Sequence, residues 1–527
     1  MSQARTLARA AGGTMILILI SRLLGFVRER AVAEVFGRTW QTDAFRAAFH
    51  IPDLMYFLLV GGALSAAFIP VFSQYLATRD EDEAWRVASS FLNLVVGLLL
   101  VFTVLGVLFT PALAPLVAYG FTGEQEALLI HLMRLMFPAV FLTALAGLGI
   151  GVQNAYQRFV LPMLGPIVYN VGIILGAYLL GPRMGIDGLA YGTVAGALGN
   201  VLVQAPFVLR KARWHPVIDW SHEGMREILR LMGPALVGLS VAQVNLIIST
   251  NLASTLSEGS ITALNMANRL MQFPLGVFAM GISTVLFPSM SRLAAQGQVD
   301  ALRVTFSRGL RAILFVTVPS AVGLAVLGEP VIRLLFQAGA FGARDTLATY
   351  EALLFYTPAL IGLSGTQILT RVFYSLHDTR TPVWVSLFTL VSNTGLSLLF
   401  LHGTDLGHSG LALAYSITTL LNLGLYLVIL RRRLGRIEGG LILRGLAGSL
   451  LASGIMGLLV WAFHRELAPH LDLATMSGRL IETLAPVAAG AAVYGLVSLV
   501  LQKDETRALL GLLKARRGAR GAEPGGS

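Results

Sequence analysis

The chain has 527 residues, of which 55% are hydrophobic and 13% are charged, and its mean hydropathy is +0.73. This composition excludes an ordinary soluble globular protein and indicates a polytopic membrane protein. The formal net charge is +11, but the basic residues fall mostly in short turns between apolar stretches. We therefore expect this charge to set membrane topology and not to bind nucleic acid. The absence of Cys excludes disulfides and thiolate metal sites, and we predict no metal site.

About fourteen apolar stretches along the chain are long enough to cross roughly 30 Å of hydrocarbon as helices. They are residues 12–36, 45–76, 87–118, 127–153, 160–181, 187–209, 228–254, 262–290, 309–328, 349–375, 382–402, 409–430, 442–463 and 480–501. The first continues into "SRLLGFVRER" without a small-residue cleavage site, so we expect it to stay in the protein. The predicted fold class is an all-α polytopic membrane protein.

The connections between these segments differ in charge from one to the next. Basic residues occupy one set: Arg210, Lys211, Arg213, Arg303, Arg308, Arg311, Arg431, Arg432, Arg433 and Arg436. The alternate connections "YGFTGEQEA", "TLSEGS" and "HGTDLGHSG" contain no Lys or Arg. The positive-inside rule therefore predicts that both termini lie in the cytoplasm.

Two pairs of similar stretches indicate an internal repeat. "GLAYGTVAGALGN" begins at Gly188 and "GLALAYSITTLLN" at Gly410, a shift of 410 − 188 = 222. "GALSAAFIPVFS" begins at Gly62 and "GISTVLFPSMS" at Gly281, a shift of 281 − 62 = 219. Each unit contains six segments, so the repeats should be parallel and related by an axis along the membrane normal.

The repeat predicts how the chain is divided. We expect an N-terminal lobe at 1–211 and a C-terminal lobe at 212–433. Segments 13 and 14, at 434–503, are left outside the repeat, and a basic, Gly-rich cytoplasmic tail follows at 504–527.

Charged residues inside the predicted first segment are candidate functional residues, because a charge in hydrocarbon needs water or a partner. "SRLLGFVRER" contains Arg22, Arg28 and Glu29. Arg22 and Glu29 are seven residues apart and share one helix face, while Arg28 points about 120° away. Gly25 lies between the two arginines and would permit a bend.

Two further stretches carry polar residues near or within hydrocarbon. "TDAFRAAFHIPD" places Asp43 and His50 at the start of the second segment, where Asp43 is a candidate substrate contact or a helix cap. "ANRLMQFP" places Arg269 inside the eighth, flanked by Asn268 and Gln272, and pairing with an acid or snorkelling to an interface are its structural alternatives. The shift of 219 sets Arg269 against His50, since 269 − 219 = 50, so both could line one central cleft.

These intramembrane charges are biased positive, which favours an anionic substrate. The planar guanidinium of Arg donates two parallel hydrogen bonds to neighbouring phosphate oxygens, so pyrophosphate is a natural candidate. By charge alone, carboxylates or nucleotides would also fit.

Several motifs resemble those of a known family. "SRLLGFVRE", "TDAF", "ANRLMQFPLGVF", "LFPSMSR" and "FYSLHDTRTPV", together with about fourteen segments, are similar to the MurJ (MviN) family of lipid II flippases, within the multidrug/oligosaccharidyl-lipid/polysaccharide exporter superfamily. The resemblance covers nearly the whole chain. It implies two six-helix lobes around a central cationic cavity, a groove for the polyprenyl tail at 434–503, alternating access, and a place in the bacterial inner membrane.

The resemblance also implies site residues. The paired arginines of the first segment correspond to Arg22 and Arg28, the Asp of "TDAF" to Asp43, and the Arg of "RLMQFP" to Arg269. We take these four as substrate-binding candidates, with His50, Asn268, Gln272 and Glu29 as candidate cavity-lining residues.

This chain departs from some relatives in its polar residues. They have Arg and Glu where this chain has Tyr56 and Gly61, and Asp and Glu where it has Asn268 and Gln272. Some also have a sodium-binding Asp in the seventh helix, whereas "LVGLSVAQVNLIIST" contains no acid. We therefore expect fewer ion pairs in the cavity and predict no sodium site and no cofactor.

The resulting hypothesis is a transporter and not an enzyme. Lipid II would be held at its pyrophosphate by Arg22, Arg28 and Arg269 while its headgroup crosses the membrane, with the membrane potential as the candidate driving force. Membrane lipids are expected around it, and cell-wall synthesis proteins are candidate partners. Two alternatives stay open: an exporter of another lipid-linked sugar or of a drug, and a polyprenyl-phosphate glycosyltransferase, which the short loops disfavour.

Overall fold

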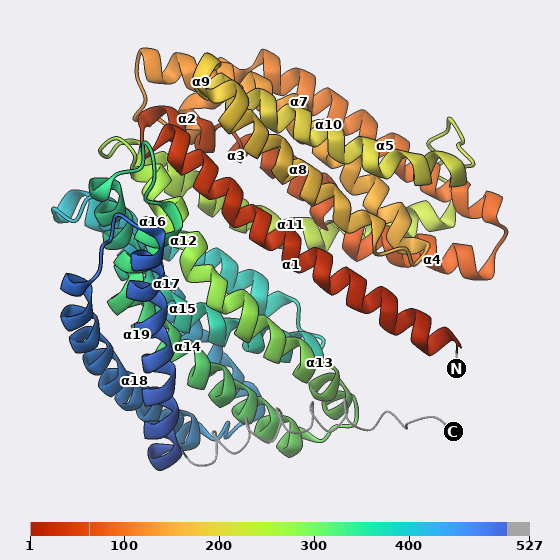
Figure 1. The fold of residues 1–527 in the computed structure, drawn as a ribbon. Helices are drawn as coiled ribbons and strands as arrows, with labels where there is room; N and C mark the ends of the chain where they lie inside the picture. The colour runs from red at the N-terminus through yellow and green to blue at the C-terminus, as the bar shows by residue number, and fades with distance from the viewer. Residues whose placement is uncertain (1, 63, 503–527) are drawn as a thin grey trace, which may run out of the picture. The chain divides into compact units, whose positions relative to one another are not determined.

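The computed structural model describes residues 2–62 and 64–502 (Figure 1). All the regular structure within them is helical, which confirms the predicted all-α class. The chain divides into two compact units. Unit 1 contains Met1–Thr262 and Leu335–Asp345, and unit 2 contains Ala263–Leu334 and Thr346–Ser527. The lobes at 1–211 and 212–433 and the separate segment at 434–503 stay predictions, and the tail at 504–527 lies outside the described residues.

Unit 1 is built from the helices up to α11. They are α1 (Ser2–Phe36), α2 (Trp40–Ala47), α3 (His50–Tyr56), α4 (Ile69–Thr78), α5 (Glu81–Leu108), α6 (Thr110–Val117), α7 (Glu124–Ala155), α8 (Leu164–Leu175), α9 (Gly181–Met184), α10 (Ile186–Lys211) and α11 (Glu223–Ser254), with π-helices at Phe57–Gly62, Leu64–Phe68 and Gly176–Leu180 and a 3₁₀ turn at Leu161–Met163. Helix α10 packs along α7 and α8 (Figure 1).

The predicted segment 45–76 is an interrupted helix. Helix α2 ends at Ala47 and α3 begins at His50, two residues before Pro52. Pro52 has no backbone N–H, so it cannot bond to the carbonyl four residues earlier, and the break falls at this point. Two π-helical stretches then separate α3 from α4. Such interruptions are frequent at functional sites.

The core of unit 1 is aromatic where α4 and α5 meet. Phe68 and Phe91 stack with ring centroids 5.0 Å apart, and Phe72 meets the edge of Trp85 at 5.5 Å. All four side chains are fully buried. This packing fixes the ends of α4 and α5 to each other.

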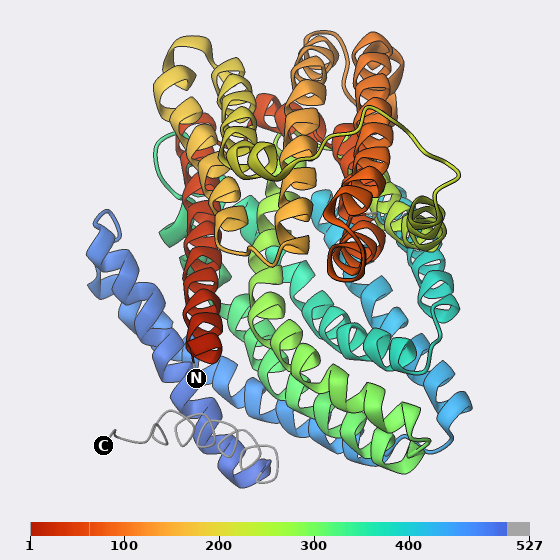
Figure 2. The ribbon, with the colours of Figure 1, turned by 90° about the vertical axis from the view of Figure 1, so that its right-hand side faces the viewer.

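Unit 2 contains most of the remaining helices. They are α12 (Ser260–Pro274), α13 (Met280–Ala295), α14 (Val299–Phe336), α15 (Ala343–Ser375), α16 (Arg380–Gly403), α17 (His408–Leu434), α18 (Gly439–Leu467) and α19 (Met476–Leu501), with a π-helix at Leu275–Ala279 and a 3₁₀ turn at Ala468–His470. The start of α12 (260–262), the end of α14 (335–336) and the start of α15 (343–345) belong to unit 1. Helices α18 and α19 form an antiparallel hairpin, blue in Figure 2. Helix α14 has 38 residues, about 57 Å at 1.5 Å per residue, so it extends beyond the hydrocarbon if it crosses it upright.

Eleven helices of the described residues are long and apolar enough to cross a membrane. All fourteen predicted segments lie on helices, but 12–36, 45–76 and 228–254 are outside this set of eleven. The protein is therefore a polytopic helical membrane protein, while the count of fourteen spans stays a prediction.

Two glycines related by the predicted repeat make the same unusual contact. Gly120 and Gly339 differ by 339 − 120 = 219 positions, and both belong to unit 1. A Cβ on Gly120 would lie 2.3 Å from the carbonyl oxygen of Ser254, and one on Gly339 would lie 2.3 Å from that of Glu34. Ser254 ends α11 and Glu34 lies in the last turn of α1, so in both places a loop glycine packs on the end of a long helix. The repeat itself stays a prediction.

Candidate functional site

The arginines of α1 differ in their surroundings. Arg22 is exposed, whereas Arg28 is half-buried and donates from Nη2 to Glu29 Oε1 at 2.8 Å. Glu29 is only 6% exposed, and its other oxygen accepts from Nη2 of Arg46, on α2, at 2.9 Å. The structure therefore brings Arg28 and Glu29 together, and it adds Arg46 to them.

This cluster carries more positive than negative charge. Arg28 and Arg46 share the single carboxylate of Glu29. Nε of Arg46 is buried and makes no hydrogen bond with any described residue. A buried donor without an acceptor is costly, so the Arg46 guanidinium is suited to donate a hydrogen bond to a further anionic or polar group.

Asp43 is held by neutral donors and not by an arginine. One carboxylate oxygen accepts from the backbone N–H of Gly259 at 2.7 Å, and the other accepts from the N–H and the hydroxyl of Thr262 at 2.7 and 2.6 Å. Asp43 is 3% exposed. The Asp43 carboxylate therefore caps the start of α12 and not that of its own helix, while its role as a substrate contact stays a prediction.

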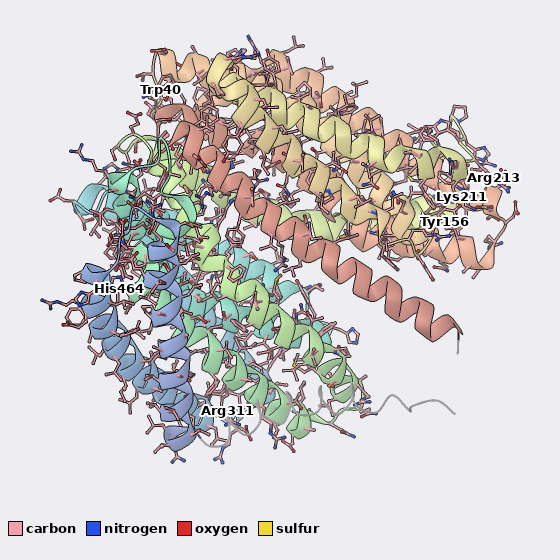
Figure 3. The ribbon with its side chains drawn as sticks, viewed as in Figure 1. Trp40, Tyr156, Lys211, Arg213, Arg311 and His464 are labelled. Carbon is pink, nitrogen blue, oxygen red and sulfur yellow. The ribbon has the colours of Figure 1, made fainter. Side chains whose placement is uncertain are left out.

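The start of α2 receives the matching contact from the α11–α12 connection. Glu258 Oε1 accepts from the backbone N–H of Trp40 at 3.0 Å, and the Glu258 carbonyl accepts from Arg38 Nη1 at 2.9 Å. Figure 3 labels Trp40 at this position. Glu258, just before α12, therefore caps the start of α2, and Asp43, on α2, caps the start of α12. Each negative carboxylate is also stabilised by the partial positive charge at the helix N-terminus.

His50 is buried and pairs with Thr250 of α11, whose hydroxyl lies 2.8 Å from Nε2. Both residues belong to unit 1. The contact ties α3 to α11 and gives His50 a structural partner.

Arg269 lies on α12 in unit 2, and its side chain is exposed. One turn of the same helix carries a hydrogen bond from Nε2 of Gln272 to Oδ1 of Asn268, at 2.5 Å. Arg22 and Arg28 belong to unit 1.

Unit 2 contains an apolar groove between α14 and the α18–α19 hairpin. Its volume is about 610 Å³. The residues that line it are Pro274, Phe278, Phe315, Val316, Pro319, Ser320, Gly323, Leu324, Leu327, Val331, Met456, Val460, Pro486, Val487, Gly490, Ala491, Tyr494 and Gly495. Only Ser320 and Tyr494 contribute side-chain hydroxyls, and both donate to backbone carbonyls, Tyr494 to Phe315 at 2.6 Å. The groove is suited to hydrocarbon.

Sequence reasoning missed a charged cluster beside this groove. Arg333 donates from Nη1 to Glu482 Oε1 at 2.5 Å and from Nη2 to Glu329, and Nε2 of His464 lies 3.2 Å from Glu482 Oε1. We call these four residues the Arg333 cluster. The available signal was Glu482, the single acid in an otherwise apolar final segment.

A second polar cluster anchors the basic connection between α10 and α11, which runs across the ends of neighbouring helices (Figure 2). Arg213 lies 3.4 Å from Glu81, and Glu81 accepts from the Tyr156 hydroxyl at 2.6 Å. The Lys211 ammonium lies over the Tyr156 ring, 5.5 Å from its centroid. Figure 3 labels Tyr156, Lys211 and Arg213. This part of the basic charge holds a loop in place.

A family model described as "Lipid II flippase MurJ" matches residues 32–477. The chain belongs to the MurJ family. A MurJ protein of Buchnera aphidicola is 35% identical over 412 residues, covering 77% of this chain and 80% of that one. This MurJ-family chain also matches a solved "Lipid II flippase MurJ, inward closed conformation" with a TM-score of 0.77 and 25% identity, over 93% of this chain and 99% of that one.

The fold extends beyond the MurJ family. A multidrug resistance MATE family transporter of the MOP superfamily, solved in an inward-facing conformation, matches with a TM-score of 0.67 and 17% identity, over 81% of this chain and 99% of that one. At this identity the likeness concerns the fold alone. Because it belongs to the MurJ family, the chain is a membrane transporter and not an enzyme.

Proposed function

We propose that this chain moves lipid II across the bacterial inner membrane, carrying its pyrophosphate-linked headgroup from the cytoplasmic to the outer leaflet. The observation that carries the proposal is that Arg22 and Arg28 lie on the 35-residue helix α1 and Arg269 lies in the candidate membrane span Ser260–Ala295 of a MurJ-family chain. A scaffold would have no reason to keep these charges, because an Arg at the bilayer centre costs about 2.5–3.5 kcal/mol on insertion scales.

The Arg28–Glu29–Arg46 group supports an anionic substrate. One carboxylate serves two guanidinium groups, so a net positive charge is held in half-buried surroundings. Phosphate oxygens match the planar donor fork of Arg, and the interaction is strong where water is scarce. Arg46 joins Arg22, Arg28 and Arg269 as a candidate contact to the pyrophosphate.

The apolar groove is the proposed place for the polyprenyl tail. Its lining is almost entirely hydrocarbon, and it lies against α18 and α19, which are outside the predicted repeat. A tail held there stays out of water while the headgroup crosses. Asp43 is assigned a different role, because its carboxylate is already occupied by Gly259 and Thr262. We propose that Asp43 holds the starts of α2 and α12 in one state of the transport cycle.

The proposed cycle is alternating access by two six-helix lobes, at 1–211 and 212–433, with fourteen spans and both termini in the cytoplasm. It needs no covalent step. A net charge carried through the membrane couples to the potential at about 2.3 kcal/mol per charge per 100 mV, so the potential is a sufficient driving force.

The test is transport in vesicles that contain the purified chain and fluorescent lipid II. Arrival of label at the far leaflet is followed with a membrane-impermeant quencher. The parent should move lipid II, and Arg28→Ala with Arg46→Ala should lower the rate tenfold or more. Arg308→Ala, an exposed arginine outside the groove, is the matched control and should leave the rate unchanged. Equal rates in all three proteins would contradict the proposed site, and no transport by the parent would contradict the proposed substrate.

A further inference from the structure

The Arg333 cluster is charged, largely buried, and drawn from three helices of unit 2. Arg333 and Glu329 lie on α14, His464 on α18 and Glu482 on α19. Glu482 is 1% exposed, and the side chains of Arg333 and His464 are 18% and 24% exposed. Figure 3 labels His464 near the turn of the α18–α19 hairpin. The cluster therefore ties the hairpin to α14 close to that turn.

The cluster lies directly beyond one end of the apolar groove. Val331, Val460 and Pro486 line the groove on α14, α18 and α19. Arg333 follows Val331 by two residues, His464 follows Val460 by four, and Glu482 precedes Pro486 by four. Four residues are about one helical turn, so on each of the three helices the groove's apolar lining is followed by a residue of the cluster within about one turn.

A hydrocarbon chain cannot extend into the cluster without a large cost. Glu482 Oε1 is already shared by Arg333 and His464, and the buried Oε2 has no hydrogen-bond partner among the described residues. Pushing hydrocarbon between these groups would separate buried opposite charges and leave them unpaired, which is among the most unfavourable changes in a protein interior. Hydrocarbon also offers no hydrogen bond in exchange.

The groove therefore has a defined length from this end. From Phe315 to Val331 the groove follows α14 over 331 − 315 = 16 residue steps, roughly 24 Å at 1.5 Å per residue. Along this length the groove side chains offer no charge. A chain that enters from the Phe315 end can lie in the groove until it reaches the Arg333 cluster.

We propose that the Arg333 cluster is a chain stop, which sets how many isoprene units of a polyprenyl lipid the groove can hold. This inference rests on the proposed function, since it takes the groove to hold the lipid's tail. It assigns a specificity role to Arg333, His464 and Glu482 that is separate from the arginines proposed to hold the pyrophosphate.

The test measures the affinity of the purified chain for a graded series of polyprenyl phosphates, from shorter than the groove to longer than it. For the parent, affinity should rise with each isoprene unit and then become constant. The variant Arg333→Met/His464→Leu/Glu482→Leu replaces the stop with hydrocarbon of similar volume. Of the cluster it leaves only Glu329, whose side chain is 40% exposed and can be solvated without Arg333, so the variant should fold. In this variant the length at which affinity becomes constant should increase by at least one isoprene unit.

His470→Leu is the matched control, since it makes the same substitution near the same turn at an exposed position. It should keep the parent's length profile. A triple variant that folds and keeps the parent's profile would overturn the chain stop. A parent whose affinity does not depend on chain length would instead contradict the groove as the tail site, so the two failures can be told apart. If the triple variant does not fold, Arg333→Met/Glu482→Leu, which removes the ion pair and keeps His464, should still lengthen the profile, and an unchanged profile would overturn the stop.

Discussion

Asp43 in unit 1 and Glu482 in unit 2 are carboxylates with almost no exposed surface, at 3% and 1%, but their partners differ in kind. Asp43 accepts hydrogen bonds from two backbone N–H groups and one hydroxyl, all of them neutral. Glu482 accepts from the charged Arg333 and from His464, and one of its oxygens is left without a hydrogen bond among the described residues.

The difference shows two ways of keeping a charge away from water. Asp43 is stabilised by neutral donors at the start of α12. If Asp43 and this helix end separate, no second charged group is left unpaired. Glu482 is stabilised by an opposite charge, so separating the pair leaves two buried ions unpaired. The first arrangement suits a contact that opens during transport, and the second suits a permanent one.

The largest effect is expected from breaking the Glu482 pair on one side. Glu482→Leu leaves Arg333 with only Glu329 near it, and loss of one partner of a buried pair costs about 3–5 kcal/mol. Chemical denaturation in detergent should show this loss, and the triple apolar replacement should recover most of it. If Glu482→Leu is as stable as the parent, this would contradict the proposal that the Arg333–Glu482 pair stabilises the folded protein.

A smaller effect is expected at Asp43. Asp43→Ala removes three hydrogen bonds to a carboxylate and leaves two N–H groups to find other acceptors, a loss of about 2–3 kcal/mol. Thr262→Ala removes only the hydroxyl bond and should cost about 1 kcal/mol. The same denaturation measurement checks both values. Equal losses in the two variants would show that the backbone contacts contribute little.

The smallest effect is expected at Asp378, in the short turn between α15 and α16. Burial raises the pKa of Asp378, but hydrogen bonds from Thr381 and Arg380 and the Arg433 guanidinium outweigh it, so its pKa lies below the usual 3.8. It therefore combines the neutral donors of Asp43 with the charged partner of Glu482.

Asp378→Asn should cost about 1 kcal/mol at neutral pH, as expected for a weakened helix cap. A carboxyl with a lowered pKa in the folded protein stabilises it above the unfolded pKa and loses that contribution as pH falls through the folded value. The difference between parent and variant should therefore be constant above about pH 4 and shrink below it. Denaturation at a series of pH values checks this, and a difference that grows on acidification would show the opposite sign of pKa shift.

Much of the fold could be predicted because apolar length and loop charge are local properties of the sequence. The predicted segments lie on helices, although segment 45–76 is divided into α2, α3, two π-helical stretches and α4. The interruption near Pro52 followed from a missing N–H, but the π-helical stretches after it carry no comparable local signal.

The site could be predicted only in part, because a list of intramembrane charges does not say which of them are already paired. Arg28 and Glu29 were recognised as charges in hydrocarbon, but their partner Arg46 lies on another helix. The Arg333 cluster joins α14 to the α18–α19 hairpin, and Arg333 and Glu482 are 149 residues apart in the sequence. Their meeting depends on tertiary packing, which no single segment encodes.

The central claim is that the arginines of this MurJ-family chain grip the pyrophosphate of lipid II. The most direct measurement uses cells that depend on this chain alone and an externally added enzyme that cleaves lipid II, with Arg269→Ala compared with the parent and with Arg308→Ala. Lipid II should be cleaved in the parent and in the Arg308 variant but not in the Arg269 variant, although all three proteins are inserted in the membrane. Equal cleavage in all three would contradict the role of Arg269, and protection of lipid II in the parent would contradict the substrate itself.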